Sequence, residues 1–311
     1  MKGIQIVATG SAVPKKVMTN DDWAKLVETN DEWIRTRTGI RERHMCENER
    51  NIDLGLQAAR QALERSGIDK NELAMVIVAT FSPDYATPSQ ACMIHEALEL
   101  SASVAAFDMN AACSGFLFAL KSAAALLEQE DKKYALIVGS EKISSKLDFT
   151  DRSTCVLFGD GAGAAVVTTD ENAVFAADWG SLGNKEGLYC SYDKEDAYVH
   201  MDGQSVFKSA VRTMSECAEH VLAQAEISLE EIPYVVCHQA NERIIKSVMK
   251  QLGGSEEQFF VNIGKYGNTS AASIPIALNE LKESGAVKAG DRVLCVAFGA
   301  GFTHCGLLVT F

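Results

Sequence analysis

The amino-acid sequence predicts an α/β protein built from two similar halves. Apolar runs of strand length alternate with segments of helical period, the pattern of strands joined by helices. The chain also repeats itself weakly, at offsets of 159 and 158 residues: Glu72–Val78 resembles Glu231–Cys237, and Lys133–Val138 resembles Asp291–Val296. A common order and a near-constant offset favour a duplicated half over chance.

The elements follow from these patterns in chain order. Nine apolar runs are expected to be strands: Gly3–Thr9, Met75–Thr80, Val104–Met109, Tyr134–Val138, Gly163–Thr168, Tyr234–Cys237, Phe259–Ile263, Val293–Phe298 and Gly306–Phe311. Four amphipathic or apolar segments are expected to be helices: Asp53–Ser66, with Asp53 as N-cap and Gly67 beyond its end, Phe116–Leu127, Ser209–Gln224 and Glu242–Leu252. We expect a largely parallel sheet and halves spanning 1–172 and 173–311, since no linker rich in Pro, Gly or Ser separates them.

Composition narrows the class of protein. The 311 residues carry a formal net charge of -13, which argues against a general nucleic-acid binder but leaves room for one basic patch. No signal peptide is recognisable, and no stretch reaches 18 apolar residues. The nine cysteines form no C-x-x-C pair, and most lie in apolar runs (Cys92, Cys155, Cys237, Cys295). We therefore predict a cytoplasmic protein with free thiols, no metal site, and neither a nucleic-acid nor a membrane partner.

Cys113 differs from the other cysteines in its surroundings. It follows the predicted strand that ends at Met109 and precedes the apolar helix Phe116–Leu127, with small residues on both sides. A sharp strand-to-helix turn exposes a reactive atom, and a helix N-terminus favours a thiolate. Cys113 is therefore a candidate nucleophile. The alternative is a buried cysteine that packs beneath the helix.

Two further residues are candidates to assist this thiol. His238 ends the strand Tyr234–Cys237 and begins a loop, although a histidine in such a place often serves only as a structural hydrogen-bonding group. Asn268 lies in a glycine-containing turn before another helix, where an asparagine is usually just an N-cap. Their joint position in the two halves is a stronger signal than either residue alone.

Six ordered motifs resemble one family along the whole chain. They are Asp31–His44, Ala111–Phe116, Phe158–Ala164, His238–Asn241, Gly267–Ser273 and Phe298–Phe302. The sequence resembles the β-ketoacyl-acyl-carrier-protein synthase III family, condensing enzymes of the thiolase-like superfamily. The resemblance implies a thiolase-like fold in which two similar βα halves form a layered αβαβα body.

The resemblance also implies a reaction and its residues. Cys113, His238 and Asn268 correspond to the catalytic triad of the family. The thiol would take an acyl group from an acyl-CoA primer and pass it to decarboxylated malonyl-acyl carrier protein, which starts fatty acid synthesis without a cofactor. Backbone N–H groups of Cys113 and Ala300 would form the oxyanion hole, with Ala300 where relatives often have Gly. Thiolases use a second cysteine, and the nearest rival here, Cys305, is predicted to be core.

The resemblance implies a coenzyme A site as well. Trp33 and Arg152 would sandwich the adenine, and Arg37 would meet the phosphates with Thr29 nearby. The residues expected to line the pantetheine tunnel are Gly203, Phe207, Asn241 and Phe298. Arg35, Arg41 and Arg43 complete a cationic cluster with Arg37, although a solvated surface is the simpler interpretation for Arg41 and Arg43. Phe158–Ala164 is predicted to be a turn that permits close packing rather than a phosphate loop.

Basic residues near the tunnel are candidates for docking of an acidic carrier protein. Arg243, Lys246 and Lys250 recur at spacings of three and four on the helix Glu242–Leu252, opposite its apolar stripe. With Lys208 and Arg212 they form a predicted basic rim that would steer the carrier protein. The alternative is an ordinary solvated helix face.

Primer choice and assembly are expectations from the family. Relatives are homodimers in which a residue at the position of Thr87 reaches the acyl pocket of the partner subunit, and relatives restricted to acetyl primers commonly carry Phe there. Thr87 should therefore open space for longer or branched acyl-CoA. Two other functions remain possible at this stage: an acyl-CoA condensing enzyme of secondary metabolism, and a Cys-His-Asn thioester hydrolase.

Overall fold

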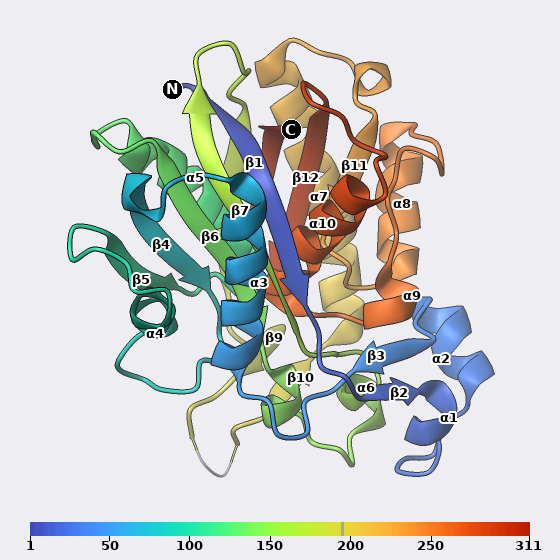
Figure 1. Cartoon of the computed structure of the whole chain (residues 1–311). Coiled ribbons are helices and arrows are strands. Elements are labelled where there is room, and N and C mark those ends of the chain that lie inside the picture. Colours follow the sequence, from blue (N-terminus) through green and yellow to red (C-terminus); the bar gives the residue numbers. More distant parts are fainter. Residues whose placement is uncertain (194–195) are drawn as a thin grey trace.

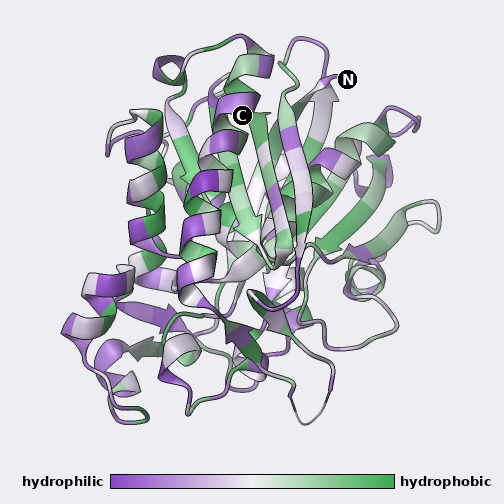
Figure 2. Cartoon of the chain, turned by 180° about the vertical axis from the view of Figure 1, so that it is seen from behind, coloured by the Kyte–Doolittle hydropathy of each residue, from purple (hydrophilic) through white to green (hydrophobic). Residues whose placement is uncertain are grey.

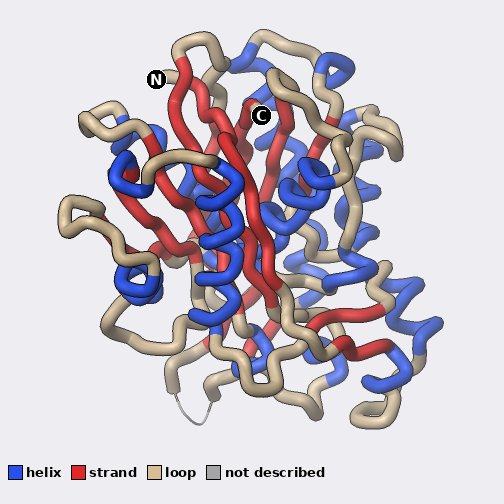
Figure 3. The backbone as a smooth tube through the Cα atoms, viewed as in Figure 1, coloured by secondary structure: helices blue, strands red, loops and turns tan. Residues whose placement is uncertain are grey.

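The computed structural model describes residues 1–193 and 196–311 as thirteen strands and ten α-helices (Figures 1 and 3). The strands are β1 Gly3–Ala12, β2 Val17–Thr19, β3 Glu42–His44, β4 Leu73–Ala79, β5 Ala105–Met109, β6 Tyr134–Glu141, β7 Gly161–Asp170, β8 Ala177–Asn184, β9 Leu188–Cys190, β10 Val199–Met201, β11 Tyr234–Cys237, β12 Arg292–Gly299 and β13 Gly301–Thr310. The helices are α1 Asn20–Trp23, α2 Asp31–Thr38, α3 Asn51–Ser66, α4 Gln90–Ala97, α5 Gly115–Leu127, α6 Arg152–Cys155, α7 Gly203–Ala225, α8 Glu242–Leu252, α9 Ile263–Tyr266 and α10 Ser273–Glu283. Two short 3₁₀ turns, η2 Ala112–Ser114 and η5 Ser270–Ala272, precede α5 and α10.

The main sheet repeats one strand pattern twice. The N-terminal half has the order β5-β4-β6-β7-β1, and the C-terminal half has the order β11-β12-β13-β8. Strands β4, β6, β7 and β1 of the N-terminal half correspond to β11, β12, β13 and β8 of the C-terminal half. In each set of four, the first pair of neighbours is parallel (β4–β6, β11–β12) and the two following pairs are antiparallel (β6–β7 and β7–β1; β12–β13 and β13–β8). The halves join through β1 and β13. The sheet is mixed, so the expectation of a largely parallel sheet was wrong.

The chain is arranged in five layers, helices alternating with strands, and three hydrophobic cores lie between the layers. Helices α3 and α4 pack against one face of the N-terminal strands, and α7 and α8 pack against the outer face of the C-terminal strands. Helices α5 and α10 fill the middle core, which contains residues of β4, β6, β12 and β13. Both faces of these strands are buried, which is why their sequences read as continuous apolar runs (Figure 2). The layered αβαβα arrangement predicted from the sequence is confirmed.

Several predicted elements differ from the structure in informative ways. The expected strand Phe259–Ile263 is reduced to one bridge, Val235 to Phe259, because Ile263 instead begins α9 and packs in the core around Trp23. Helix α3 begins after Arg50, and Asp53 accepts the backbone N–H of Arg50 rather than acting as N-cap. Gly67 ends this helix with a left-handed φ of 65°, as expected.

The cysteines are mostly core residues. All nine are free thiols, and five of them, Cys155, Cys217, Cys237, Cys295 and Cys305, are buried. Cys92 is exposed on α4, so its assignment to the apolar interior was wrong. Among residues 1–193 and 196–311, no helix is long and apolar enough to cross a membrane.

Candidate active site

One cavity of about 260 Å³ collects the predicted catalytic residues. Its lining includes Cys113 from the N-terminal half, and His238 and Asn268 from the C-terminal half. The predicted tunnel and oxyanion residues also line it: Gly203, Phe207, Asn241, Phe298 and Ala300. Most of the remaining lining is apolar, with side chains from β9, β10 and α7. The structure therefore brings together residues that the sequence placed up to 187 positions apart.

The nucleophile candidate lies at the start of a helix. Cys113 is in the turn η2, immediately before α5, and is partly exposed to the cavity. Ala112 adopts a left-handed φ of 47°, which tightens the turn and brings the thiol to the cavity wall. Burial raises the pKa of the Cys113 thiol to about 12, and a hydrogen bond from Ser270 opposes this rise. A thiolate at neutral pH therefore requires help beyond the helix N-terminus.

His238 is held as a neutral imidazole. It is 2% exposed, and burial lowers its pKa to about 3. Its Nδ1 lies 2.7 Å from Ser273 Oγ, and that oxygen also accepts the backbone N–H of Gln239 at 3.3 Å. Ser273 Oγ already accepts the N–H of Gln239 and has no other acceptor for its hydrogen in the described part of the chain, so the hydroxyl can donate to Nδ1. This arrangement favours the tautomer with its proton on Nε2, where it acts as a donor.

Asn268 is oriented by its own turn. Its side-chain oxygen accepts the backbone N–H of Ser270 at 2.8 Å, and its backbone N–H donates to the carbonyl of Leu157 at 2.9 Å. The amide nitrogen makes no such contact within the described part of the chain, so the –NH₂ group is available as a donor. Asn268 thus satisfies the first N–H of the turn η5 with its oxygen and leaves its amide nitrogen open to the cavity.

The segment that carries Ala300 approaches the nucleophile turn closely. A Cβ on Gly299 would lie 2.8 Å from the backbone nitrogen of Cys113, so only glycine fits there. Thr303 ties the two segments, since its hydroxyl lies 3.0 Å from the carbonyl oxygen of Ala111 and 3.1 Å from that of Ala300. Ala300 is not one of the residues with positive φ, so its backbone suits alanine.

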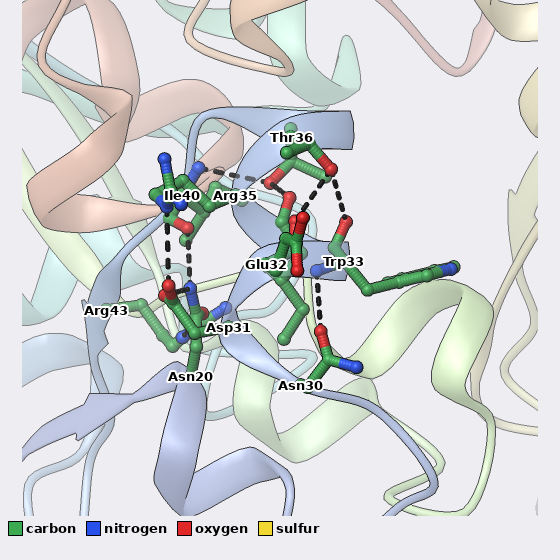
Figure 4. A network of polar contacts seen from close by, with 11 residues as sticks. Asn20, Asn30, Asp31, Glu32, Trp33, Arg35, Thr36, Ile40 and Arg43 are labelled. Atoms are coloured by element: carbon green, nitrogen blue, oxygen red, sulfur yellow. Dashed lines mark hydrogen bonds and ion pairs between the residues drawn. The ribbon is translucent and has the colours of Figure 1, made fainter.

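The predicted coenzyme A residues cluster beside the cavity. The guanidinium carbons of Arg37 and Arg152 lie 4.7 and 4.9 Å from the centre of the Trp33 ring. Figure 4 shows this ring extending from α2 on the side away from Asn20 and Arg43. Asn241 in the cavity wall donates to the backbone carbonyl of Arg37 at 3.1 Å. The hydroxyl of Thr29 is buried without a protein partner in the described residues, as a ligand-binding group would be.

Arg43 is not part of the cationic surface. It is fully buried and donates to the carbonyl oxygens of Met18 and Val156 and to the side chain of Asn20 (Figure 4). Burial lowers its pKa to about 10. The solvated-surface interpretation was therefore wrong for this residue and right for Arg41, which is exposed. The predicted packing role of Phe158–Ala164 is consistent with Gly159, where a Cβ would lie 2.3 Å from the carbonyl oxygen of Tyr266.

The predicted docking and primer residues lie outside the cavity lining. Lys208, Arg212, Arg243, Lys246 and Lys250 are all exposed. Arg243 lies 5.7 Å from the ring of Phe207, a cavity residue, whereas Lys246 is paired with Glu242 at 2.6 Å. Arg212 lines a separate hollow of about 210 Å³ that also contains acidic residues. Thr87 is exposed on the loop before α4.

Sequence reasoning missed the polar residues that support the triad. Ser270, Ser273, Thr303 and Glu141 contact the catalytic candidates or their neighbours. Ser270 and Ser273 belong to the Gly267–Ser273 motif, so that motif was the available signal for them. Glu141 had no comparable signal, because it stands alone at the end of an apolar strand.

Comparison with known protein families agrees with the resemblance read from the sequence, in both halves of the chain. A family model described as 3-oxoacyl-[acyl-carrier-protein (ACP)] synthase III matches residues 107–183, and the model of its C-terminal part matches residues 222–311. A beta-ketoacyl-[acyl-carrier-protein] synthase III from Clostridium acetobutylicum is 45% identical over 316 residues, covering 97% of each chain. The relative of that name from Aquifex aeolicus is 44% identical and covers 99% of this chain and 100% of its own.

Solved structures give the same result. The 3-oxoacyl-[acyl-carrier-protein] synthase III of Aquifex aeolicus superposes with a TM-score of 0.94 at 44% identity, covering 99% of this chain and 100% of that one. The beta-ketoacyl-[acyl carrier protein] synthase III of Thermus thermophilus has a TM-score of 0.94 at 39% identity, covering 99% of both chains. Sequence identity and fold agree over full length, and the chain belongs to the 3-oxoacyl-[acyl-carrier-protein] synthase III family.

Proposed function

We propose that this chain catalyses the initiating condensation of fatty acid synthesis. An acyl-CoA primer and malonyl-acyl carrier protein give 3-oxoacyl-acyl carrier protein, CO₂ and CoA, with no further cofactor. The observation that carries the proposal is the convergence of Cys113, His238 and Asn268 on one largely apolar cavity in a member of this family. The curated relatives carry the synthase III name, so secondary metabolism and thioester hydrolysis are not favoured.

In the first stage the Cys113 thiolate attacks the thioester carbonyl of the primer. The S–C bond to Cys113 forms, the S–C bond to CoA breaks, and CoA leaves. The backbone N–H groups of Cys113 and Ala300 stabilise the oxyanion of the tetrahedral intermediate. Thr303 supports this role by tying together the two segments that carry these donors.

In the second stage malonyl-acyl carrier protein enters and loses CO₂. His238 Nε2–H and the Asn268 –NH₂ group donate to the thioester oxygen, where enolate charge develops. The enolate carbon then attacks the acyl group on Cys113, and the thiolate leaves. Two neutral donors suit this step because the cavity buries His238 in an uncharged state.

Substrate entry involves the residues beside the cavity. Trp33 and Arg152 hold the adenine of CoA, with Arg37 and Thr29 at its phosphates, and Gly203, Phe207, Asn241 and Phe298 line the path of the pantetheine. Because both guanidinium groups contact Trp33 in the free protein, one of them must move for the adenine to stack. Arg243, Lys250 and Lys208 lead the docking of the carrier protein, with Lys246 and Arg212 in lesser roles because acidic groups lie beside them.

The active form is proposed to be a homodimer of chains with two fused halves, 1–172 and 173–311. Strand β5 lies at one end of the sheet and offers an unpaired edge. Thr87, exposed in one chain, would reach the acyl pocket of a second copy. A threonine in place of an aromatic ring leaves more room, so longer or branched primers should be accepted.

Intact mass spectrometry tests the function directly. The protein is incubated with acetyl-, butyryl- and isobutyryl-CoA, and each acyl mass should appear on Cys113 and disappear only when malonyl-acyl carrier protein is added. C113A should gain no mass, while C92S, which removes an exposed thiol outside the cavity lining, should behave as wild type. Discharge to free acid without an acceptor would indicate a hydrolase instead.

A further inference from the structure

A buried carboxyl group, that of Glu141, lies near the nucleophile and is separated from it in space by Ser270. Glu141 is the last residue of β6 and is 0% exposed. It has no ion pair with Lys, Arg or His in the part of the chain that the structure describes. A buried, unpaired carboxyl group is costly to maintain, so its hydrogen-bond partners are informative.

Oxygen Oε2 of Glu141 is saturated by the loop after β4. It accepts the hydroxyl of Thr80 at 3.1 Å, the backbone N–H groups of Phe81 and Ser82 at 3.2 Å each, and the hydroxyl of Ser82 at 2.5 Å. With four donors, Oε2 has no room for a proton of its own.

The directions of these hydroxyl hydrogens are fixed. Thr80 Oγ1 accepts from Asn51 Nδ2 at 3.1 Å, and Ser82 Oγ accepts from the backbone N–H of Lys142 at 2.9 Å. Each hydroxyl therefore uses its hydrogen toward Glu141. The loop after β4 therefore keeps Oε2 as a hydrogen-bond acceptor, and Oε1 is the oxygen that can take up a proton.

Oxygen Oε1 accepts a longer bond from the backbone N–H of Phe81 at 3.4 Å and faces the catalytic cavity through one hydroxyl. Ser270 Oγ donates to it at 3.2 Å, and Ser270 also lies beside the Cys113 thiol, so its one hydroxyl hydrogen can serve Glu141 or Cys113 but not both at once. Ser270 lines the cavity together with Cys113, whereas Glu141 does not. Ser270 adopts a left-handed φ of 49°, which places it in this position between the two groups.

The charges explain why this link matters. Burial raises the pKa of Glu141 to about 7 and that of Cys113 to about 12, and the Glu141 charge adds to the rise at Cys113. Losing the thiol proton to solvent would place two negative charges in one buried region. Moving that proton to Glu141 leaves the region with one negative charge throughout.

We propose that Ser270 and Glu141 form a proton relay for Cys113, an inference that rests on the proposed function. The S–H bond of Cys113 breaks as its proton passes to Ser270 Oγ. The original hydroxyl proton of Ser270 passes to Oε1 of Glu141, and the thiolate electron pair attacks the thioester. When Cys113 leaves as a thiolate after condensation, both protons return. Ser270 lies beside the reacting sulfur, and Glu141 acts through it as a positioning and proton-holding residue.

Few other titratable groups face Glu141. The thiols of Cys113 and Cys190 lie within electrostatic range. The ammonium group of Lys142 donates to the backbone carbonyl of Glu49 at 2.7 Å and is engaged there. His238 is the rival acceptor in the cavity, but burial lowers its pKa to about 3, so it holds a proton poorly.

The pH profile of Cys113 alkylation tests the relay without any acyl substrate. Iodoacetamide reacts with the thiolate, and the modified peptide is quantified by mass spectrometry. With the relay, part of the thiolate forms without proton exchange with solvent once Glu141 is ionised, so the wild-type rate should rise less steeply than tenfold per pH unit from about pH 7.5 to about pH 9. In E141Q the proton must leave to solvent, and the rate should rise about tenfold per pH unit.

Each alternative gives a different profile. A wild-type rate that rises tenfold per pH unit would overturn the relay, and so would an equally shallow rise in E141Q, which would assign the proton to His238. D160N is the matched control, because Asp160 is equally buried and accepts from Cys46 and Ser144 but does not touch Ser270. It should keep the wild-type profile.

Single-turnover acylation by acetyl-CoA gives a second readout. Loss of a proton acceptor should lower the acylation rate about 100-fold in E141Q and S270A with little change in the acetyl-CoA concentration giving half-maximal rate. S270A keeps the test available if E141Q does not fold, and unchanged acylation in S270A would contradict the relay. Failure of the wild-type protein to take up an acyl group would instead reject the proposed function. The pH profile of alkylation would still test the relay, because it needs no acyl substrate.

Discussion

Asn110 and Asn268 occupy equivalent turns in the two halves of the molecule. The side-chain oxygen of each accepts the backbone N–H two residues later, that of Ala112 at 3.2 Å and that of Ser270 at 2.8 Å. Ala112 and Ser270 both have left-handed φ values, 47° and 49°. The turn in the N-terminal half presents the Cys113 thiol, and the turn in the C-terminal half presents the Asn268 amide. One local structure thus serves two chemical roles.

Asn268→Asp should separate the two stages of the reaction. Aspartate keeps the oxygen that accepts the N–H of Ser270 but replaces the donor –NH₂ group with an acceptor. The condensation rate should fall by about 10²–10³, as for the loss of one oxyanion donor, because enolate charge loses its partner. Acylation of Cys113, followed by mass spectrometry, should fall by less than about tenfold. Equal losses in both stages would contradict the assigned role.

Ser273→Ala tests the tautomer of His238. Without the hydroxyl, Nδ1 loses its donor at 2.7 Å, and the proton can move from Nε2 to Nδ1. The condensation rate should fall about tenfold with the KM for malonyl-acyl carrier protein unchanged, since about 1.4 kcal/mol is the scale of one such hydrogen bond. Ser284→Ala, at the end of the same helix, is the control. A loss in KM alone would assign Ser273 to substrate binding.

The sequence predicted those parts of the fold whose side chains report burial locally. Strand β11 has the predicted bounds because each residue of Tyr234–Cys237 packs in an apolar layer. Strand β8, the counterpart of β1, was missed because its glycines and exposed positions give no alternating pattern. The segment from Phe259 was misread because apolar residues occur in strands and in packed helix starts alike.

The same reasoning explains which residues of the candidate active site could be predicted from the sequence. Cys113, His238 and Asn268 stand next to element boundaries, where local sequence carries a signal. Glu141 depends on Thr80 and Ser270, which are 61 and 129 residues away. No local pattern encodes such contacts, so only the assembled sheet reveals them.

Trp33→Leu should weaken binding of the acyl-CoA primer. Removing the ring takes away a stacking surface that two guanidinium groups already contact. The KM for acetyl-CoA should rise about tenfold while the rate at saturation changes little, because the ring does not line the cavity that holds the thiol. Trp179→Leu is the control, since that ring is exposed and likewise carries a cationic group, Lys121 Nζ at 3.7 Å. An equal change in the KM for acetyl-CoA in both variants would mean that the adenine does not bind at Trp33.

Reversing two charges beside the cavity tests carrier-protein docking. R243E/K250E should raise the KM for malonyl-acyl carrier protein at least about tenfold at low salt, with a smaller effect at high salt because ions screen exposed charges. K133E/K288E changes the net charge equally at exposed sites outside the cavity lining and is the control. An unchanged KM in R243E/K250E would assign these residues to an ordinary solvated helix face.

The buried imidazole of His238 should make the protein less stable in acid. Its folded-state pKa of about 3 lies below the ordinary value of 6.5, so the unfolded chain binds a proton that the native state cannot. The free energy of unfolding contributed by this group is therefore fully present above pH 6.5 and is lost as the pH falls toward 3. Between pH 7 and pH 5 the loss is about 2 kcal/mol, since each pH unit below 6.5 costs about 1.4 kcal/mol.

His238→Asn removes this titration while keeping a polar side chain. Urea unfolding at pH 7 and pH 5 should show a drop that is about 2 kcal/mol smaller in the variant than in the wild type. Every other titratable group is present in both proteins and cancels in the comparison. The same drop in both would mean that His238 takes up its proton in the folded state, and an imidazolium would then replace the neutral donor in the decarboxylation step.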